Sequence, residues 1–90
     1  MVVYTVDARP RVRKALRQLD PTVRKDVLAT MRVLATNPRP PGVKSLRGHP
    51  SWLRVRAGDY RIIYTVDDQA LVVTVATVGH RREVYRDLDL

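Results

Sequence analysis

The sequence contains no cysteine, no phenylalanine and only one tryptophan among its 90 residues. Without cysteine, a disulfide scaffold, a cysteine-ligated zinc site and catalysis by a thiol are excluded. No apolar run approaches the roughly 18 residues of a membrane-spanning helix. The first residues, MVVYTVD, lack the basic start of a signal peptide and predict a strand instead. We therefore expect a cytoplasmic protein with no membrane partner.

Positive charge is the dominant feature of the composition. Lys and Arg number 17 against 9 Asp and Glu, which gives a net charge of +8 and an isoelectric point near 10.8. The whole excess lies in residues 1–50. Such a charge points to a polyanionic partner, namely a nucleic acid, an anionic membrane or an acidic protein, although solvated arginines without a partner are the plain alternative. The length and the 44% hydrophobic content predict one globular domain, residues 1–90.

The first half of the chain predicts a short strand and two helices. The strand continues through Tyr4–Val6, and Asp7 is expected to cap a helix that carries Pro10 in its first turn. Asp20 is expected to cap a second helix, which begins at Pro21 and ends before Asn37-Pro38. Apolar residues recur at helical spacing, at Val12, Ala15, Leu16 and Leu19 in the first helix and at Val23, Val27, Leu28, Met31, Leu34 and Ala35 in the second. Residues 39–48, with two prolines and two glycines, predict a loop.

The second half has the period of two that is typical of strands. Alternation predicts strands over 52–57 and 60–66, joined by a two-residue turn at Gly58-Asp59. A turn at 67–69 leads to an apolar, β-branched stretch at 70–78, which is expected to be a central strand that Gly79 ends. The tail from His80 to Leu90 has only Val84, Tyr85 and Leu88 as apolar anchors. The predicted class is α+β, with a short N-terminal strand, a two-helix hairpin and then an antiparallel meander.

The hairpin predicts a cluster of arginines on one face of the sheet. If Gly58 and Asp59 form the turn, Arg56 lies opposite Arg61 and Arg54 lies opposite Ile63. Alternation then places Arg54, Arg56 and Arg61 together, with Trp52 and Ile63 beside them, and leaves the other face for the core. Arginines directly opposite each other repel, by a few tenths to about 1 kcal/mol. A bound phosphate would offset this repulsion, although a solvated arginine face explains the spacing about as well.

The polar tail adds further candidates. Arg81 and Arg82 follow the last predicted strand, and His80 and Glu83 are possible acid–base groups. Glu83 has the alternative role of an ion partner for Arg82. Tyr85 has three open roles: stacking on a base, plugging the core, or lying with Val84 in a last edge strand.

Several motifs together resemble the RelE/ParE toxin superfamily. They are Leu46-Arg47-Gly48, Leu53-Arg54-Val55-Arg56, the run GDYRIIY at 58–64, Val78-Gly79-His80-Arg81 and Val84-Tyr85. The resemblance covers residues 4–85, and it implies a β-α-α-β-β-β fold. The superfamily comprises toxins of type II toxin–antitoxin systems, and its RelE-like members cut mRNA in the ribosomal A site without a metal or other cofactor.

The resemblance also implies functional residues and partners. Carried over by motif, the catalytic set is Arg54, Arg56, Arg61, Arg81 and Tyr85, with RNA-binding roles for Lys44, Arg47, Trp52 and Arg82. The implied partners are an acidic antitoxin, with which the toxin forms a hetero-oligomer, and the ribosome with its mRNA. ParE-like members inhibit DNA gyrase instead, and a basic binding module without toxicity is a third possibility.

This chain departs from the RelE-type pattern at one point. The best-known RelE-type sequences have two lysines on the first strand of the hairpin, where this chain has Arg54 and Arg56. An arginine remains protonated in proteins and cannot act as a general base. We therefore expect both arginines to bind phosphate and to stabilise a transition state. This leaves water, His80, Glu83 or a ribosomal group as the base, and a toxin of reduced activity remains possible.

Overall fold

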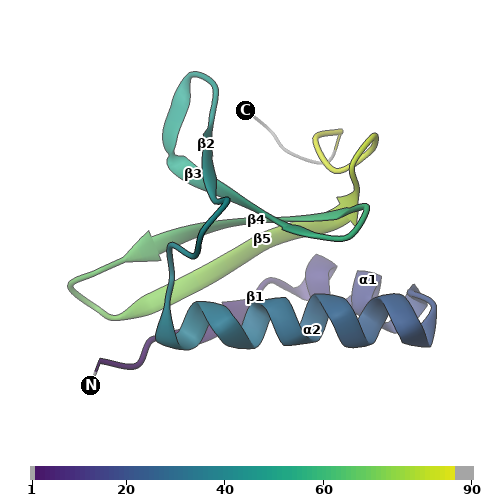
Figure 1. The fold of residues 1–90 in the computed structure, drawn as a ribbon, viewed down its shortest axis with the longest axis horizontal. Helices are drawn as coiled ribbons and strands as arrows, with labels where there is room; N and C mark the ends of the chain where they lie inside the picture. The colour runs from purple at the N-terminus through teal and green to yellow at the C-terminus, as the bar shows by residue number, and fades with distance from the viewer. Residues whose placement is uncertain (1, 87–90) are drawn as a thin grey trace.

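The computed structural model describes residues 2–86, which form one five-stranded sheet with two helices. The elements are β1 (Thr5–Ala8), α1 (Pro10–Gln18), α2 (Pro21–Thr36), β2 (Lys44–Leu46), β3 (His49–Ala57), β4 (Tyr60–Asp67) and β5 (Val72–His80). The strand order is β1-β5-β4-β3-β2, with β1 parallel to β5 and every other pair antiparallel. Both helices lie on one side of the sheet (Figure 1). The α+β class is confirmed, and we call the other side of the sheet the open face.

The helix boundaries follow the proline and capping signals, with one exception. Pro10 and Pro21 occupy the first turns of their helices, and the Asp20 carboxylate accepts the Thr22 backbone N–H at 3.0 Å. The expected cap at Asp7 was wrong. Asp7 belongs to β1, where it pairs with Thr74, and the residue that precedes α1 is Arg9, whose side chain makes no capping hydrogen bond. The strand extends further than its few apolar residues indicate.

One arginine of the basic half has a structural role between the two helices. The Arg24 guanidinium donates to the backbone carbonyls of Leu16 at 2.8 Å, Leu19 at 3.0 Å and Arg17 at 3.1 Å. These carbonyls lie at the C-terminal end of α1, where helical partners are lacking. Arg24 therefore closes the helical hairpin, and part of the positive charge is already engaged inside the fold.

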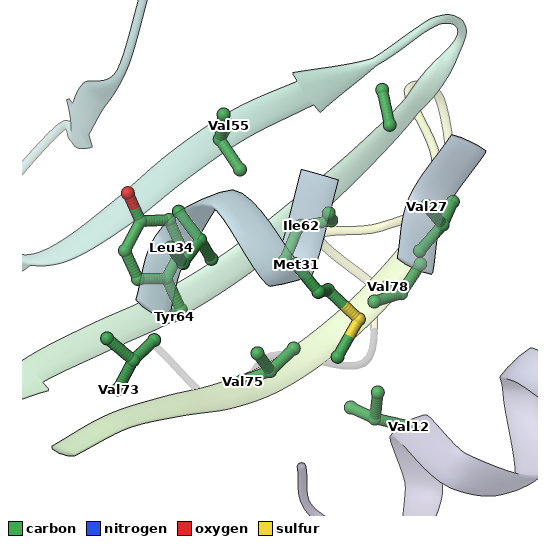
Figure 2. Close-up of a cluster of buried hydrophobic side chains, with 11 residues drawn as sticks. Val12, Val27, Met31, Leu34, Val55, Ile62, Tyr64, Val73, Val75 and Val78 are labelled. Atoms are coloured by element: carbon green, nitrogen blue, oxygen red, sulfur yellow. The ribbon is translucent and has the colours of Figure 1, made fainter. Parts of the chain in front are cut away.

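The main core lies between the helices and the sheet, as the alternation in the hairpin predicted (Figure 2). Its buried members are Val12, Val27, Met31, Leu34, Val55, Ala57, Ile62, Tyr64, Val73, Val75 and Val78. A second, smaller cluster lies on the open face and consists of Leu46, Ile63 and Val84, with Trp52 packed against it. This second cluster anchors the start of the tail to the open face.

Several strand boundaries differ from the sequence prediction, and β3 begins at His49 rather than at Trp52 because the strand continues before Trp52 and His49 pairs with Leu46 of β2. Residues 44–46, expected in a loop, form β2 and pair with β3. The last strand begins at Val72 rather than at residue 70, because the Asp67 carboxylate accepts the N–H groups of Gln69 and Ala70 and Leu71 adopts a left-handed φ of 58° to complete the turn. Gly79 does not end the strand, since it pairs with Arg61 inside β5.

Neither helix within residues 2–86 is long and apolar enough to cross a membrane.

Tyr64 provides a test of how the loop after α2 is fastened to the sheet. Its buried hydroxyl donates to the Pro38 carbonyl at 2.7 Å, and burial raises its pKa from 10.0 to about 12. The folded state therefore favours the protonated phenol, so its contribution to stability is complete below pH 10 and is lost as the pH rises to about 12. The Tyr64→Phe variant is expected to lose about 1 kcal/mol of stability at pH 7.

The same variant should show a smaller fall in melting temperature between pH 10 and 12 than the wild type. Thermal unfolding followed by circular dichroism across this range measures both effects. An unchanged alkaline slope in Tyr64→Phe would contradict the assignment.

Candidate active site

The candidate site begins with an arginine cluster on the open face, formed by Arg54 and Arg56 of β3 and Arg61 of β4. Arg56 pairs with Arg61 and Arg54 pairs with Ile63, which is the register that the Gly58-Asp59 turn predicts. Gly58 has the positive φ, 61°, that the first position of this turn requires. The Arg61 guanidinium donates to the carbonyls of Gly58 at 3.0 Å and Tyr60 at 3.1 Å, so its position over the hairpin turn is fixed.

The arginine cluster lacks carboxylate partners among residues 2–86. The ion pair found in that part of the chain joins Arg39 to Asp68, at 2.9 Å, on the loop that follows α2 and the β4–β5 turn. Arg54, Arg56 and Arg61 line a hollow of about 300 Å³ together with Gly42 and Lys44. Three guanidinium groups and an ammonium group thus share one concave surface, which is a suitable environment for a phosphate group.

Strand β2 and the turn after it bring two more cations to the site, Lys44 and Arg47. Lys44 pairs with Arg54 across the β2–β3 ladder, and Arg47 lines a second hollow of about 470 Å³ that also includes Arg54. Sequence reasoning proposed both residues for RNA binding and placed them in a loop, which is correct for Arg47 but wrong for Lys44. The signal that could have found the strand is weak, since β2 has only three residues and lies between a proline-rich stretch and Gly48.

Tyr85 joins the arginine cluster from the tail. Its hydroxyl accepts a hydrogen bond from an Arg54 Nη at 2.8 Å, and it lines the same hollow as Arg47. Its side chain is 39% exposed, and residues 81–86 form turns. The two alternatives for Tyr85, a core plug and part of an edge strand, were therefore wrong. The buried anchor is its neighbour Val84, as expected, whereas Leu88 lies outside the described residues.

A close approach of the tail to β5 sets the position of Tyr85. A Cβ atom added to Gly79 would lie 3.2 Å from the Val84 Cα, so the missing side chain leaves the space that Val84 occupies. The turn is also held by its own backbone, since the Val84 N–H donates to the His80 carbonyl at 2.9 Å.

Within residues 2–86, the other candidates from the tail form no side-chain hydrogen bond or ion pair with the arginine cluster. Arg81 begins next to the hairpin turn, because its backbone N–H donates to the Asp59 carbonyl at 2.8 Å, and its side chain is exposed. Arg82 and Glu83 are also exposed, and they form no ion pair with each other.

His80 pairs with Tyr60, and the two rings meet edge-on at 5.8 Å between centroids. Since Tyr60 packs against the main core, His80 lies on the helix side and away from the arginine cluster.

Trp52 is half-buried on the open face, and the Arg9 guanidinium carbon lies 5.7 Å from the centroid of its ring. Sequence reasoning proposed Trp52 for RNA binding but did not single out Arg9, the residue that precedes α1.

Within residues 2–86, no three His, Asp or Glu side chains gather closely enough to hold a metal ion.

Comparison with known proteins places the chain in a family. Residues 2–85 match the model of the ParE toxin of the type II toxin–antitoxin system parDE. The chain is 34% identical to the mRNA interferase toxin RelE of Escherichia coli K12, over 96% of this chain and 94% of that protein. The structure resembles the archaeal RelE–RelB complex from Pyrococcus horikoshii, with a TM-score of 0.78, 29% identity and coverage of 89% of this chain and 97% of that chain.

It also resembles the RelBE2 toxin–antitoxin complex of Mycobacterium tuberculosis, with a TM-score of 0.78, 31% identity and coverage of 90% and 94% of the two chains. The family match covers nearly all of the sequence, and the relatives named RelE share both the fold and about a third of the residues. The chain therefore belongs to the ParE toxin family of type II toxin–antitoxin systems, on the RelE-like branch of the RelE/ParE superfamily.

Proposed function

We propose that this toxin is an endoribonuclease that cuts mRNA in the ribosomal A site, in the cytoplasm, and thereby stops translation. The observation that carries the proposal is the arginine cluster on the open face. Its arginines form no ion pair with a carboxylate among residues 2–86, and Arg54 donates a 2.8 Å hydrogen bond to the Tyr85 hydroxyl. The relatives named mRNA interferases support the same activity.

The proposed reaction is an attack by a ribose 2′-hydroxyl on the adjacent phosphorus. The bond between O2′ and phosphorus forms, the bond to the 5′ oxygen breaks, and the products are a 2′,3′-cyclic phosphate and a 5′-hydroxyl end. Negative charge accumulates on the pentavalent phosphate, where fixed guanidinium groups stabilise it most strongly. We assign this role to Arg54, Arg56 and Arg61, without a metal ion or other cofactor.

The tail supplies the other proposed contacts. Arg81 follows β5 directly beside the hairpin turn, where its backbone N–H donates to the Asp59 carbonyl, and it is assigned to the charge on the leaving 5′ oxygen. Tyr85 is assigned to orienting a nucleotide, because its ring is partly exposed while its hydroxyl is held by Arg54. Lys44, Arg47 and Arg82 would contact neighbouring phosphates.

The arginine cluster does not provide a general base, that is, a group that accepts the proton of the attacking 2′-hydroxyl. Arginine cannot accept the proton of the 2′-hydroxyl, and His80 lies on the helix side of the sheet. Water, Glu83 or a ribosomal group remain as acceptors. We therefore propose that cleavage depends on the ribosome and is slow on free RNA.

The proposed partner that restrains the toxin is an antitoxin with an acidic, poorly folded segment. The two solved neighbours described above are RelE–RelB and RelBE2 complexes, the second a toxin–antitoxin complex by name, and the net charge of +8 favours a partner of opposite sign. Such a segment would cover the basic helices or the open face.

Primer extension on one mRNA in a purified translation system, with and without ribosomes, tests the proposal. The expected result is a set of cuts that appear only with ribosomes and follow the reading frame. Uncut mRNA at concentrations that stop growth would contradict the nuclease proposal.

The match to the ParE family favours gyrase inhibition as the second candidate, for which intact mRNA and loss of supercoiling activity are expected.

A further inference from the structure

Arg9 is the residue between β1 and α1, and its side chain crosses the open face. Val6 and Ala8 of β1 pack against the main core, and the backbone of Arg9 is still extended, with φ −62° and ψ 154°. The alternation of side chains therefore turns Arg9 to the open face, as it does Asp7. From there its guanidinium group reaches Trp52 on β3, past β5 and β4, to the 5.7 Å contact.

The Arg9–Trp52 pair borders the arginine cluster. Trp52 lies two residues before Arg54 on the same face of β3, which places their backbones about 6.8 Å apart. Its ring also packs against the cluster that contains Val84, the residue before Tyr85. A nucleotide next to a phosphate on the arginine cluster would thus meet Trp52 and Arg9 directly.

We propose that Arg9 and Trp52 form a stacking platform for one base of single-stranded RNA, whose neighbouring phosphate lies on the arginine cluster. Unpaired RNA bases stack on aromatic rings and on guanidinium planes. The cation–π attraction holds the Arg9 guanidinium over the indole, while Arg9 remains exposed to a ligand on its outer side.

Charge complementarity selects RNA as the occupant of this face. The pair adjoins Lys44, Arg54, Arg56 and Arg61, and none of these cations forms an ion pair within residues 2–86. Asp7 of β1 lies two residues before Arg9 and also faces the open side, and the two residues form no ion pair. The inference rests on the proposed function, because it assigns a further part of the same substrate.

The single tryptophan makes the platform directly observable, since all indole fluorescence comes from Trp52. The probe is a 2′-O-methyl trinucleotide, which lacks the attacking hydroxyl and stays intact. The comparison ligand is the same oligonucleotide with its bases removed. The full trinucleotide is expected to quench the emission saturably and to bind at least about 5-fold more tightly than the abasic one.

Two variants of Arg9 separate stacking from charge. Arg9→Ala is expected to remove most of the difference between the full and abasic ligands, and Arg9→Lys should do the same although it keeps the charge. Arg32→Ala on the exposed part of α2 removes the same charge from the helix side and should leave both affinities unchanged. Circular dichroism of each variant establishes that the fold is retained.

Equal binding of the two ligands to the wild type would overturn the platform, and so would full rescue by Arg9→Lys. The outcome is distinguishable from that of the proposed function. Ribosome-dependent cleavage without base-dependent quenching removes the platform alone, whereas quenching without cleavage removes the nuclease alone.

Discussion

Arg56→Ala is expected to lower the rate of ribosome-dependent mRNA cleavage about 10²–10³-fold, which is the loss that follows removal of one charge-stabilising donor. Arg56 is exposed, and no hydrogen bond or ion pair within residues 2–86 involves its side chain. Its removal also relieves the repulsion with Arg61, its direct cross-strand partner. The melting temperature should therefore stay the same or rise slightly while cleavage falls.

Quantitative primer extension over a time course measures the rates, and differential scanning calorimetry measures the stability. Arg32→Ala is the matched control, because it removes one exposed arginine from the helix side of the molecule. Arg56→Lys should recover part of the rate, since it restores the charge without the planar fork that matches phosphate. Near-normal cleavage by Arg56→Ala would show that the arginine cluster acts only as a binding surface.

The arginine cluster was predictable because its geometry is local. One turn of two residues fixes the β3–β4 register, and the period of two then fixes the face of every side chain up to Trp52. The core follows from the same alternation, since Val55, Ile62 and Tyr64 face the helices as expected. Motif resemblance added Tyr85, whose contact with Arg54 spans 31 residues of sequence and has no local signal.

The features that the sequence did not reveal depend on contacts between distant segments. Strand β2 exists because Lys44 and Ser45 pair with β3, and three residues show no periodicity by themselves. Arg9 looks like one more basic residue of a helix, yet the extension of β1 through Ala8 turns it toward Trp52. The position of His80 on the helix side required the β4–β5 register, which shifts by one residue between Ile63 and Tyr64.

Gly79 is expected to be the most sensitive position outside the arginine cluster, because it determines how closely the tail approaches the sheet. In Gly79→Ala the new Cβ would lie 3.2 Å from the Val84 Cα and 3.4 Å from its Cβ. A backbone atom cannot rotate away from this contact, so the turn over residues 81–86 must move. Overpacking of this kind costs about 1–3 kcal/mol of stability.

The shift should displace Tyr85 relative to Arg54 and weaken their 2.8 Å hydrogen bond, which lowers cleavage up to about 10²-fold. Tyr85→Phe is the comparison, since it removes the hydroxyl and leaves the turn in place. If Gly79 acts through Tyr85, the double variant should lose less activity than the product of the two single losses, because the second change removes a contact that is already weakened. Losses that multiply in the double variant would instead show that Gly79 supports cleavage by a route independent of the Tyr85 hydroxyl.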